Sequence, residues 1–111
     1  DYSPEMTEKG IYSHPDLSEI IAECAAIRTK PGTLGESLLV VIRFKPGVEN
    51  PPDAPALRRM LKDHLTKQEM PREFRITREP LPKGDTGKPD WKKMEEDEAK
   101  VEAPSPQNPT L

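Results

Sequence analysis

The residue of this sequence best suited to chemistry is Lys88, which lies in the turn-rich stretch 84–90 (GDTGKPD). Gly84 and Gly87 give the backbone near the lysine a conformational freedom that other residue types lack. A lysine ammonium is a compact, strongly hydrated charge on a flexible stem, so it can reach an anionic group outside its own fold. The pattern indicates a lysine presented on a loop. Taken alone, it is more often an ordinary solvated turn.

The stretch around Lys88 does not fit a phosphate-binding P-loop. That motif needs a glycine six residues before the lysine, where this chain has Pro82, and a serine or threonine directly after it, where the chain has Pro89. No helix begins immediately after the lysine, so no row of backbone N–H groups is expected there to hold phosphates. The loop is therefore predicted to present a charge rather than to enclose a nucleotide.

The other reactive side chains form no recognisable catalytic or metal-binding pattern. Cys24 is the only cysteine and lies in an apolar run, which favours a buried strand thiol over a nucleophile. His14 is interpreted as a helix-end residue and His64 as lying at the edge of an apolar helix face. No cysteines or carboxylates accompany them at ligand spacing, so zinc is not expected. Trp91 is interpreted as packing a last helix onto the sheet, with a partner anchor as the alternative.

The first half of the chain predicts the elements that begin the fold. A helix is expected to start with Ser3 as N-cap and Pro4 at its first position, and to end at residues 13–16 (SHPD). Residues 19–27 allow either a helix or a short buried strand. Residues 38–44 (LLVVIRF) form the clearest strand. Because this run is continuously apolar, it should be central in a sheet with helices packed on it.

The second half predicts a helix, a strand, the lysine loop and a short last helix. Asp53 can cap a helix whose apolar residues follow the helical period, namely Leu57, Met60, Leu61 and Leu65. Phe74 and Ile76 alternate with polar neighbours, which indicates a further strand. Asp90 can cap the last helix. The fold class is therefore α+β, a small sheet of about three strands with flanking helices.

Composition limits the organisation and the partners of the chain. Its 111 residues, 32% hydrophobic content and 14 prolines predict one small domain over residues 1–94 and a disordered acidic and proline-rich tail over residues 95–111. The net charge of −3, with both signs interspersed, argues against a nucleic-acid partner. No apolar stretch approaches the ~18 residues of a membrane span. No secretory or peroxisomal signal is visible, so a cytoplasmic location is expected.

Eight short motifs are distributed along the chain: Ser3-Pro4, 13–17 (SHPDL), 34–36 (LGE), 44–47 (FKPG), 57–61 (LRRML), 70–74 (MPREF), 81–83 (LPK) and 86–90 (TGKPD). In this order and at near-family spacing over residues 2–94, they resemble successive landmarks in the C-terminal domain of adenylate-forming enzymes. That superfamily comprises acyl-CoA synthetases, aryl-CoA ligases, luciferases and the adenylation domains of nonribosomal peptide synthetases. Glu8 also matches a helix glutamate of the family. Each motif is weak alone, and their joint order carries the resemblance.

The resemblance implies a catalytic role for Lys88, with Thr86 and Gly87 in the loop that presents it to ATP and the acyl-adenylate. The lysine would stabilise the charge that develops when a carboxylate displaces pyrophosphate from ATP. ATP, with Mg²⁺, would be bound mainly by an N-terminal adenylation domain. CoA or the phosphopantetheine of a carrier protein would then accept the acyl group. The domain is expected to act as a lid that rotates between these two steps, and this chain alone should be inactive.

Two functions of different classes follow. The first is the lid domain of an ATP-dependent carboxylate-activating ligase, with the loop 33–36 and the surface around 84–90 as candidate contacts to the N-terminal domain. The alternative is a non-catalytic interaction or regulatory module of the same fold that binds a carrier protein or a synthetase.

Overall fold

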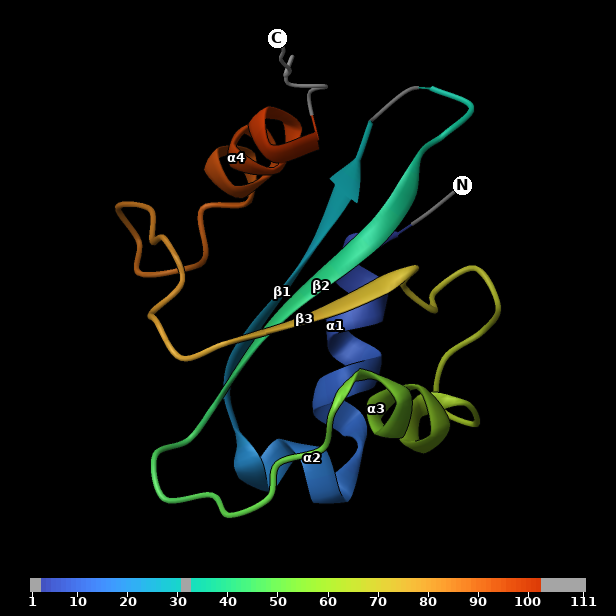
Figure 1. Cartoon of the computed structure of the whole chain (residues 1–111), viewed down its shortest axis with the longest axis vertical. Helices are drawn as coiled ribbons and strands as arrows, with labels where there is room; N and C mark the ends of the chain where they lie inside the picture. Colours follow the sequence, from blue (N-terminus) through green and yellow to red (C-terminus); the bar gives the residue numbers. More distant parts are fainter. Residues whose placement is uncertain (1–2, 31–32, 103–111) are drawn as a thin grey trace, which may run out of the picture.

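The computed structural model describes residues 3–30 and 33–102 and contains a three-stranded sheet (Figure 1). The strands are β1 (Ile21–Thr29), β2 (Ser37–Phe44) and β3 (Glu73–Thr77), in the spatial order β1-β2-β3. β1 pairs antiparallel with β2, and β3 pairs parallel with β2. The sequence prediction that the apolar run 38–44 forms the central strand is confirmed.

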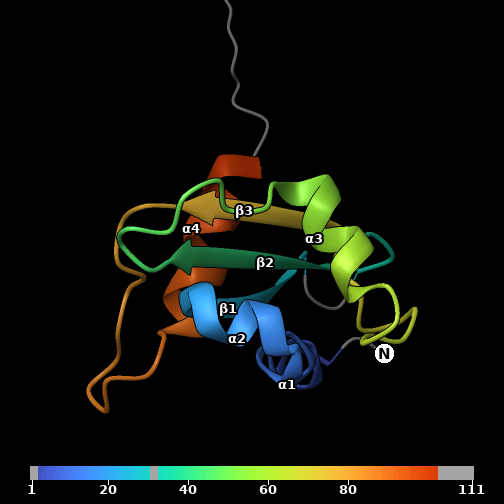
Figure 2. The same cartoon turned by 90° about the horizontal axis from the view of Figure 1, so that it is seen from below.

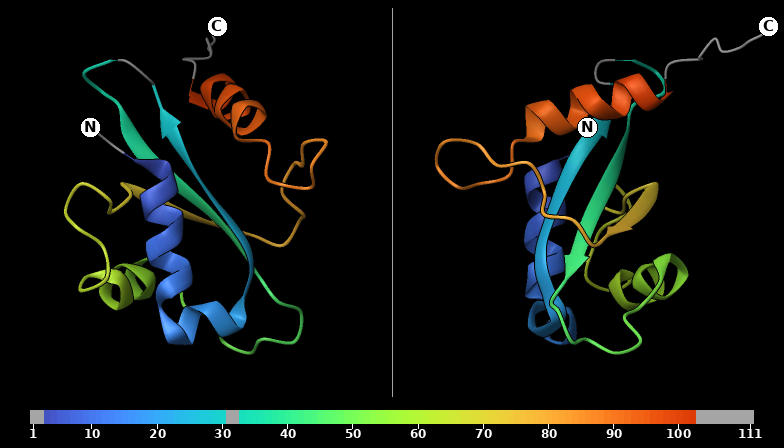
Figure 3. Two further views of the ribbon diagram at one scale, coloured as in Figure 1. Left: turned by 180° about the vertical axis from the view of Figure 1, so that it is seen from behind. Right: turned by 60° about the vertical axis from the view of Figure 1, so that its left-hand side comes forward.

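Helices cover both faces of this sheet, which gives the predicted α+β fold. α1 (Pro4–Ser13), α2 (Pro15–Ile20) and α3 (Ala54–Leu61) lie on one side, and α4 (Trp91–Glu102) lies on the other (Figures 2 and 3). None of the helices in the described part of the chain is long and apolar enough to cross a membrane.

The apolar side chains of the sheet point alternately to the two faces, as the pleat of a strand requires. Those on the α1–α3 side join a larger cluster of buried residues: Ile11, Leu17, Ile21, Cys24, Ala26, Val40, Ile42, Leu57, Leu61, Leu65 and Phe74. Those on the α4 side form a smaller cluster: Ala25, Ile27, Leu39, Val41, Leu81 and Met94. The run 38–44 is apolar at nearly every position because both of its faces are covered.

Most of the segment 19–27, which the sequence left open between helix and strand, is a strand: residues 21–27 belong to β1, whereas Glu19 and Ile20 end α2. β1 pairs with β2 along nearly its whole length, with a register irregularity between Ile21 and Glu23. Cys24 is 2% exposed within this strand, as expected for a buried thiol. Burial raises the pKa of Cys24 to about 12, so its thiol stays protonated at neutral pH and is no nucleophile.

The junction between α1 and α2 differs from the prediction in two ways. α1 ends at Ser13 as expected, but a second short helix follows at once because the His14 side chain caps it: Nδ1 accepts from the N–H groups of Asp16 at 3.2 Å and Leu17 at 3.4 Å. Ser3 occupies the N-cap position of α1, but its side chain makes no capping hydrogen bond. The structure also brings the two histidines together, with the ring centroids of His14 and His64 4.5 Å apart.

The second half of the chain follows the predicted order with shifted boundaries. Asp53 caps α3 by accepting from the N–H of Ala56 at 3.0 Å, as predicted. α4 is longer than the expected short helix and runs to Glu102, so residues 95–102 are helical rather than disordered. Two acids of this added part contact the sheet: Glu95 accepts from the N–H of Arg28 in β1, and Glu98, only 6% exposed, forms an ion pair with Arg75 of β3. The remainder of the predicted tail, residues 103–111, lies outside the described residues.

Candidate functional site

The lysine loop connects β3 to α4 and is closed by main-chain hydrogen bonds. Lys83 and Pro89 form an isolated antiparallel bridge at its base. Within the loop, the N–H of Gly84 donates to the carbonyl of Lys88 at 2.8 Å, and the N–H of Asp90 donates to the carbonyl of Pro82 at 2.9 Å. These bonds make the stretch 83–89 a small hairpin rather than an open coil.

Lys88 lies on the exposed part of this hairpin together with Thr86 and Gly87. Among residues 3–30 and 33–102, no hydrogen bond or ion pair engages the Lys88 ammonium. The hairpin projects beyond the sheet and α4 (Figure 3). The three residues that the sequence singled out therefore lie together, and the lysine charge is free to meet a group from outside this chain.

Glu23 of β1 anchors the chain segment that enters the hairpin. One oxygen, Oε2, accepts from Arg43 Nε at 2.7 Å and from the N–H of Leu81 at 3.1 Å, while Oε1 forms an ion pair with Lys83. Burial acts to raise the pKa of Glu23, but hydrogen bonds from Lys83, Arg43 and Leu81 outweigh it and lower this pKa to about 2. The ionised carboxylate therefore stabilises the fold fully above its ordinary pKa of 4.5, and this contribution is lost as pH falls toward 2.

Glu8 of α1 anchors the segment that leaves the hairpin. Its Oε2 accepts from the indole Nε1 of Trp91 at 2.6 Å and from the N–H of Ala26 at 2.8 Å. Trp91 also packs against the apolar cluster beneath α4. This agrees with the interpretation of Trp91 as a residue that packs the last helix onto the sheet.

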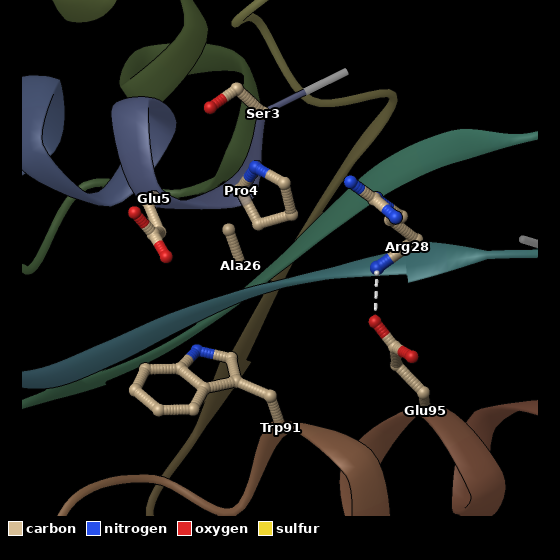
Figure 4. A pocket seen from close by; sticks show the side chains of 7 residues that line it. All are labelled: Ser3, Pro4, Glu5, Ala26, Arg28, Trp91 and Glu95. Carbon is tan, nitrogen blue, oxygen red and sulfur yellow. Dashed lines mark hydrogen bonds between the residues drawn. The ribbon is translucent and has the colours of Figure 1, made fainter. Parts of the chain in front are cut away.

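A hollow of about 430 Å³ lies beside Trp91, between the start of α1, the edge of β1 and α4 (Figure 4). It is lined by Ser3, Pro4, Glu5, Ala26, Arg28, Trp91 and Glu95. The N–H of Arg28 donates to Glu95 Oε2 at 3.1 Å across its margin. The lysine hairpin does not contribute to the lining, so Lys88 has no built pocket of its own at this place.

The loop 33–36, the other predicted contact to an N-terminal domain, is not brought near Lys88. It lies at the tip of the β1–β2 hairpin, away from the lysine hairpin in each view (Figures 1 and 3). Leu34 in this loop is fully exposed. The two predicted contact regions would therefore meet different parts of a partner.

Metal ligands are not assembled in the described part of the chain. No group of three or more histidine, cysteine, aspartate or glutamate side chains could hold a metal ion there.

Of the two glycines in the lysine hairpin, Gly87 is the one whose backbone conformation favours glycine. Its φ is +81°, whereas Gly84 has no such conformation and would place a Cβ 3.8 Å from the Lys88 carbonyl oxygen, an ordinary contact. Gly87→Ala is expected to destabilise the hairpin by about 1 kcal/mol, while Gly84→Ala leaves it nearly unchanged. Hydrogen exchange at the amides of Gly84 and Asp90 measures this: Gly87→Ala should speed exchange about fivefold. Equal exchange in both variants would contradict a strained turn at Gly87.

Solved structures contain this fold as a small part of larger chains. An acyl-CoA synthetase from Brucella canis matches with a TM-score of 0.70 at 24% identity, over 88% of this chain and 17% of that chain. ATP-bound MatB from Rhodopseudomonas palustris matches with a TM-score of 0.70 at 21% identity, over 90% and 18%. The amide bond synthetase McbA from Marinactinospora thermotolerans matches with a TM-score of 0.66 at 25% identity, over 86% and 18%.

No protein-family model and no curated protein sequence matches the chain significantly. The structural matches show that the chain has the fold of the C-terminal domain of adenylate-forming enzymes. The chain spans only 17–18% of the length of these solved chains.

Proposed function

We propose that this chain is the lid domain of an ATP-dependent carboxylate-activating ligase and that it supplies Lys88 to an N-terminal adenylation domain. The observation that carries the proposal is an exposed lysine without a partner among the described residues, held on a closed hairpin. The fold that holds this hairpin is shared with an acyl-CoA synthetase, an amide bond synthetase and MatB, the last of them solved with ATP bound.

The chemical role of Lys88 in this proposal is electrostatic. When the carboxylate of the substrate attacks the α-phosphate of ATP, negative charge accumulates on the phosphate oxygens and on the departing pyrophosphate. A lysine ammonium brought into a site from which water is excluded stabilises that charge more in the transition state than in the ground state. Thr86 and Gly87 precede the lysine in the loop that would present it. The N–H of Gly87 donates to the carbonyl of Gly84 at 3.1 Å, and its φ of +81° forms the turn before Lys88.

The remaining parts of the reaction belong to a partner domain. ATP and Mg²⁺ would be held mainly by the N-terminal domain, because the hairpin of this chain presents a charge but encloses nothing. CoA or the phosphopantetheine of a carrier protein would accept the acyl group in the second step. The proposal includes a cytoplasmic location, where ATP is consumed, and it expects this chain by itself to be inactive.

The test is ATP–pyrophosphate exchange by one polypeptide that joins this chain to its N-terminal adenylation domain, assayed over a panel of carboxylic acids. Exchange that requires both the correct acid and this chain supports the proposal. Exchange that the N-terminal domain performs equally well without this chain would instead favour the alternative, an interaction or regulatory module. The same comparison with the chain added as a separate polypeptide shows whether a covalent connection is needed.

A further inference from the structure

Glu23 is a charged residue in a strand that is otherwise almost wholly apolar. It is 9% exposed, and it lies at the register irregularity of β1, where the chain between Ile21 and Glu23 carries one residue more than the paired strand. From Glu23 onward the strand alternates regularly, so Glu23 lies on the α4 side with Ala25 and Ile27. Beyond the irregularity Ile21 packs on the opposite side, in the cluster beneath α1–α3. A buried carboxylate is also costly unless it is fully paired. The α4 side of β1 therefore carries one charged group among apolar neighbours, and this group must be paired.

The carboxylate of Glu23 is committed to the entrance of the lysine hairpin. It accepts from the N–H of Leu81 at 3.1 Å and forms an ion pair with Lys83, two residues further on. Lys83 Nζ in turn donates to the Leu81 carbonyl at 3.1 Å. Arg43 of β2 holds the same carboxylate from the other side, with Nε 2.7 Å from Oε2. Glu23 is thus tied to both neighbouring elements, the sheet and the hairpin.

The path from Glu23 to Lys88 consists of consecutive bonded steps. Glu23 binds Lys83, the backbone of Lys83 pairs with that of Pro89, and the next residue, Gly84, donates to the Lys88 carbonyl at 2.8 Å. Lys88 and Pro89 are adjacent, so the position of Lys83 determines where the lysine backbone lies. None of residues 83–90 belongs to either apolar cluster, so polar contacts such as those of Glu23 hold the base of the hairpin on the sheet.

We propose that Glu23 is the positioning residue for Lys88: by holding Leu81 and Lys83 it fixes the hairpin on the sheet and so directs the lysine toward its substrate. The catalytic consequence rests on the proposed function, whereas the anchoring of the hairpin does not. Displacement of a reacting group by about 1 Å can lower the rate on the order of a hundredfold. Loosening the contacts of Glu23 would displace Lys88 and so lower the rate of adenylation.

The chain offers a matched control in Glu98. Like Glu23 it is buried, at 6% exposure, and it forms an ion pair with an arginine of the sheet, Arg75. Its hydrogen bonds in the described residues go to Arg75 and none to the hairpin. Glu98→Gln therefore weakens a buried ion pair of the same kind without touching the proposed path. Glu23→Gln keeps the size of the side chain and removes its charge.

The first measurement is hydrogen exchange at the amides of Leu81, Gly84 and Asp90 in this chain. Glu23→Gln is expected to speed their exchange at least about tenfold beyond any change at the β2 amides, whereas Glu98→Gln leaves the hairpin within about twofold of wild type. This result needs no enzymatic activity. Hairpin exchange that is the same in the two variants would overturn the positioning role, whatever the activity of the wild type.

The second measurement is pyrophosphate exchange in the polypeptide that carries both domains. Glu23→Gln should lower kcat about tenfold with KM for ATP within about twofold, because ATP is held mainly by the other domain. Glu98→Gln should change neither. An equal loss of kcat in both variants would reduce Glu23 to a structural residue and overturn the proposal. A wild type without any pyrophosphate exchange would instead refute the proposed function, with the hydrogen-exchange result deciding the anchoring separately.

Discussion

Replacing Lys88 with alanine in the two-domain polypeptide is expected to lower the rate of pyrophosphate exchange on the order of a hundredfold or more. That is the usual effect of removing one group that stabilises charge in a transition state. The ammonium makes no hydrogen bond or ion pair within residues 3–30 and 33–102, so the loss would fall on catalysis and not on folding. The free energy of unfolding should change by less than about 0.5 kcal/mol.

Lys92 provides the matched control for this substitution. It is exposed, it lies four residues further along the chain, and it carries the same charge at the start of α4. Lys92→Ala should keep the exchange rate within about threefold of wild type, as expected for a surface charge that meets no reacting group. Lys88→Arg keeps the charge but presents a planar, differently shaped cation, so it should restore only part of the rate. A Lys88→Ala enzyme within a few-fold of wild type would show that Lys88 does not take part in adenylation.

The elements that sequence patterns predicted well are those whose signal is local. The continuous, partly β-branched apolar run of β2 favours a central strand, and the cap at Asp53 depends only on residues three positions apart. The choice between helix and strand for β1 could not be made locally, because its pairing with β2 decides it. α4 was predicted too short for a similar reason. Its acidic sequence alone indicates disorder, and contacts with distant strands, from Glu95 to β1 and from Glu98 to β3, make it part of the fold.

In the candidate site, too, the residues with a local sequence signal could be predicted and the residue with distant partners could not. Lys88, Thr86 and Gly87 could be found because glycine and lysine in one short stretch are visible in the sequence. Glu23 could not be assigned a role, because its partners Arg43, Leu81 and Lys83 lie 20 to 60 residues further along the chain. The signal that was available is a single acid inside an apolar strand, which must be paired if the strand is buried. For Ile76, the alternation of apolar and polar residues predicted the strand correctly. It did not predict that this apolar side chain would be 42% exposed.

Side chains from α1 and α4 bind the backbone N–H groups along the outer edge of β1. Alternate N–H groups along this edge point away from β2, and a strand edge with unsatisfied groups invites pairing with another chain. Here three of them are taken by side chains: that of Cys24 by the Tyr12 hydroxyl at 3.0 Å, that of Ala26 by Glu8 and that of Arg28 by Glu95. The edge is therefore closed by α1 and α4, and Glu8 holds the middle position while also binding Trp91.

Glu8→Ala is expected to lower the free energy of unfolding of this chain by about 2 kcal/mol, because it leaves the N–H of Ala26 and the indole N–H of Trp91 without an acceptor. Glu5→Ala, on the same helix but exposed, should change it by less than about 0.5 kcal/mol. Urea unfolding of the two variants makes the comparison. Equal midpoints would show that water replaces Glu8 at both donors.

The pH dependence of the stability difference between wild type and Glu8→Ala shows whether the protonated or the ionised form of Glu8 stabilises the fold. Burial raises the pKa of Glu8 above its ordinary 4.5, so the native chain binds this proton more tightly than the unfolded chain does. The stability that Glu8 contributes is therefore fully present below pH 4.5 and declines as pH rises through the raised pKa. The difference between wild type and Glu8→Ala should be larger at pH 4 than at pH 7. A difference that grows with pH would mean that the ionised form is the stabilising one, and that the hydrogen bonds from Ala26 and Trp91 outweigh the cost of burying the charge.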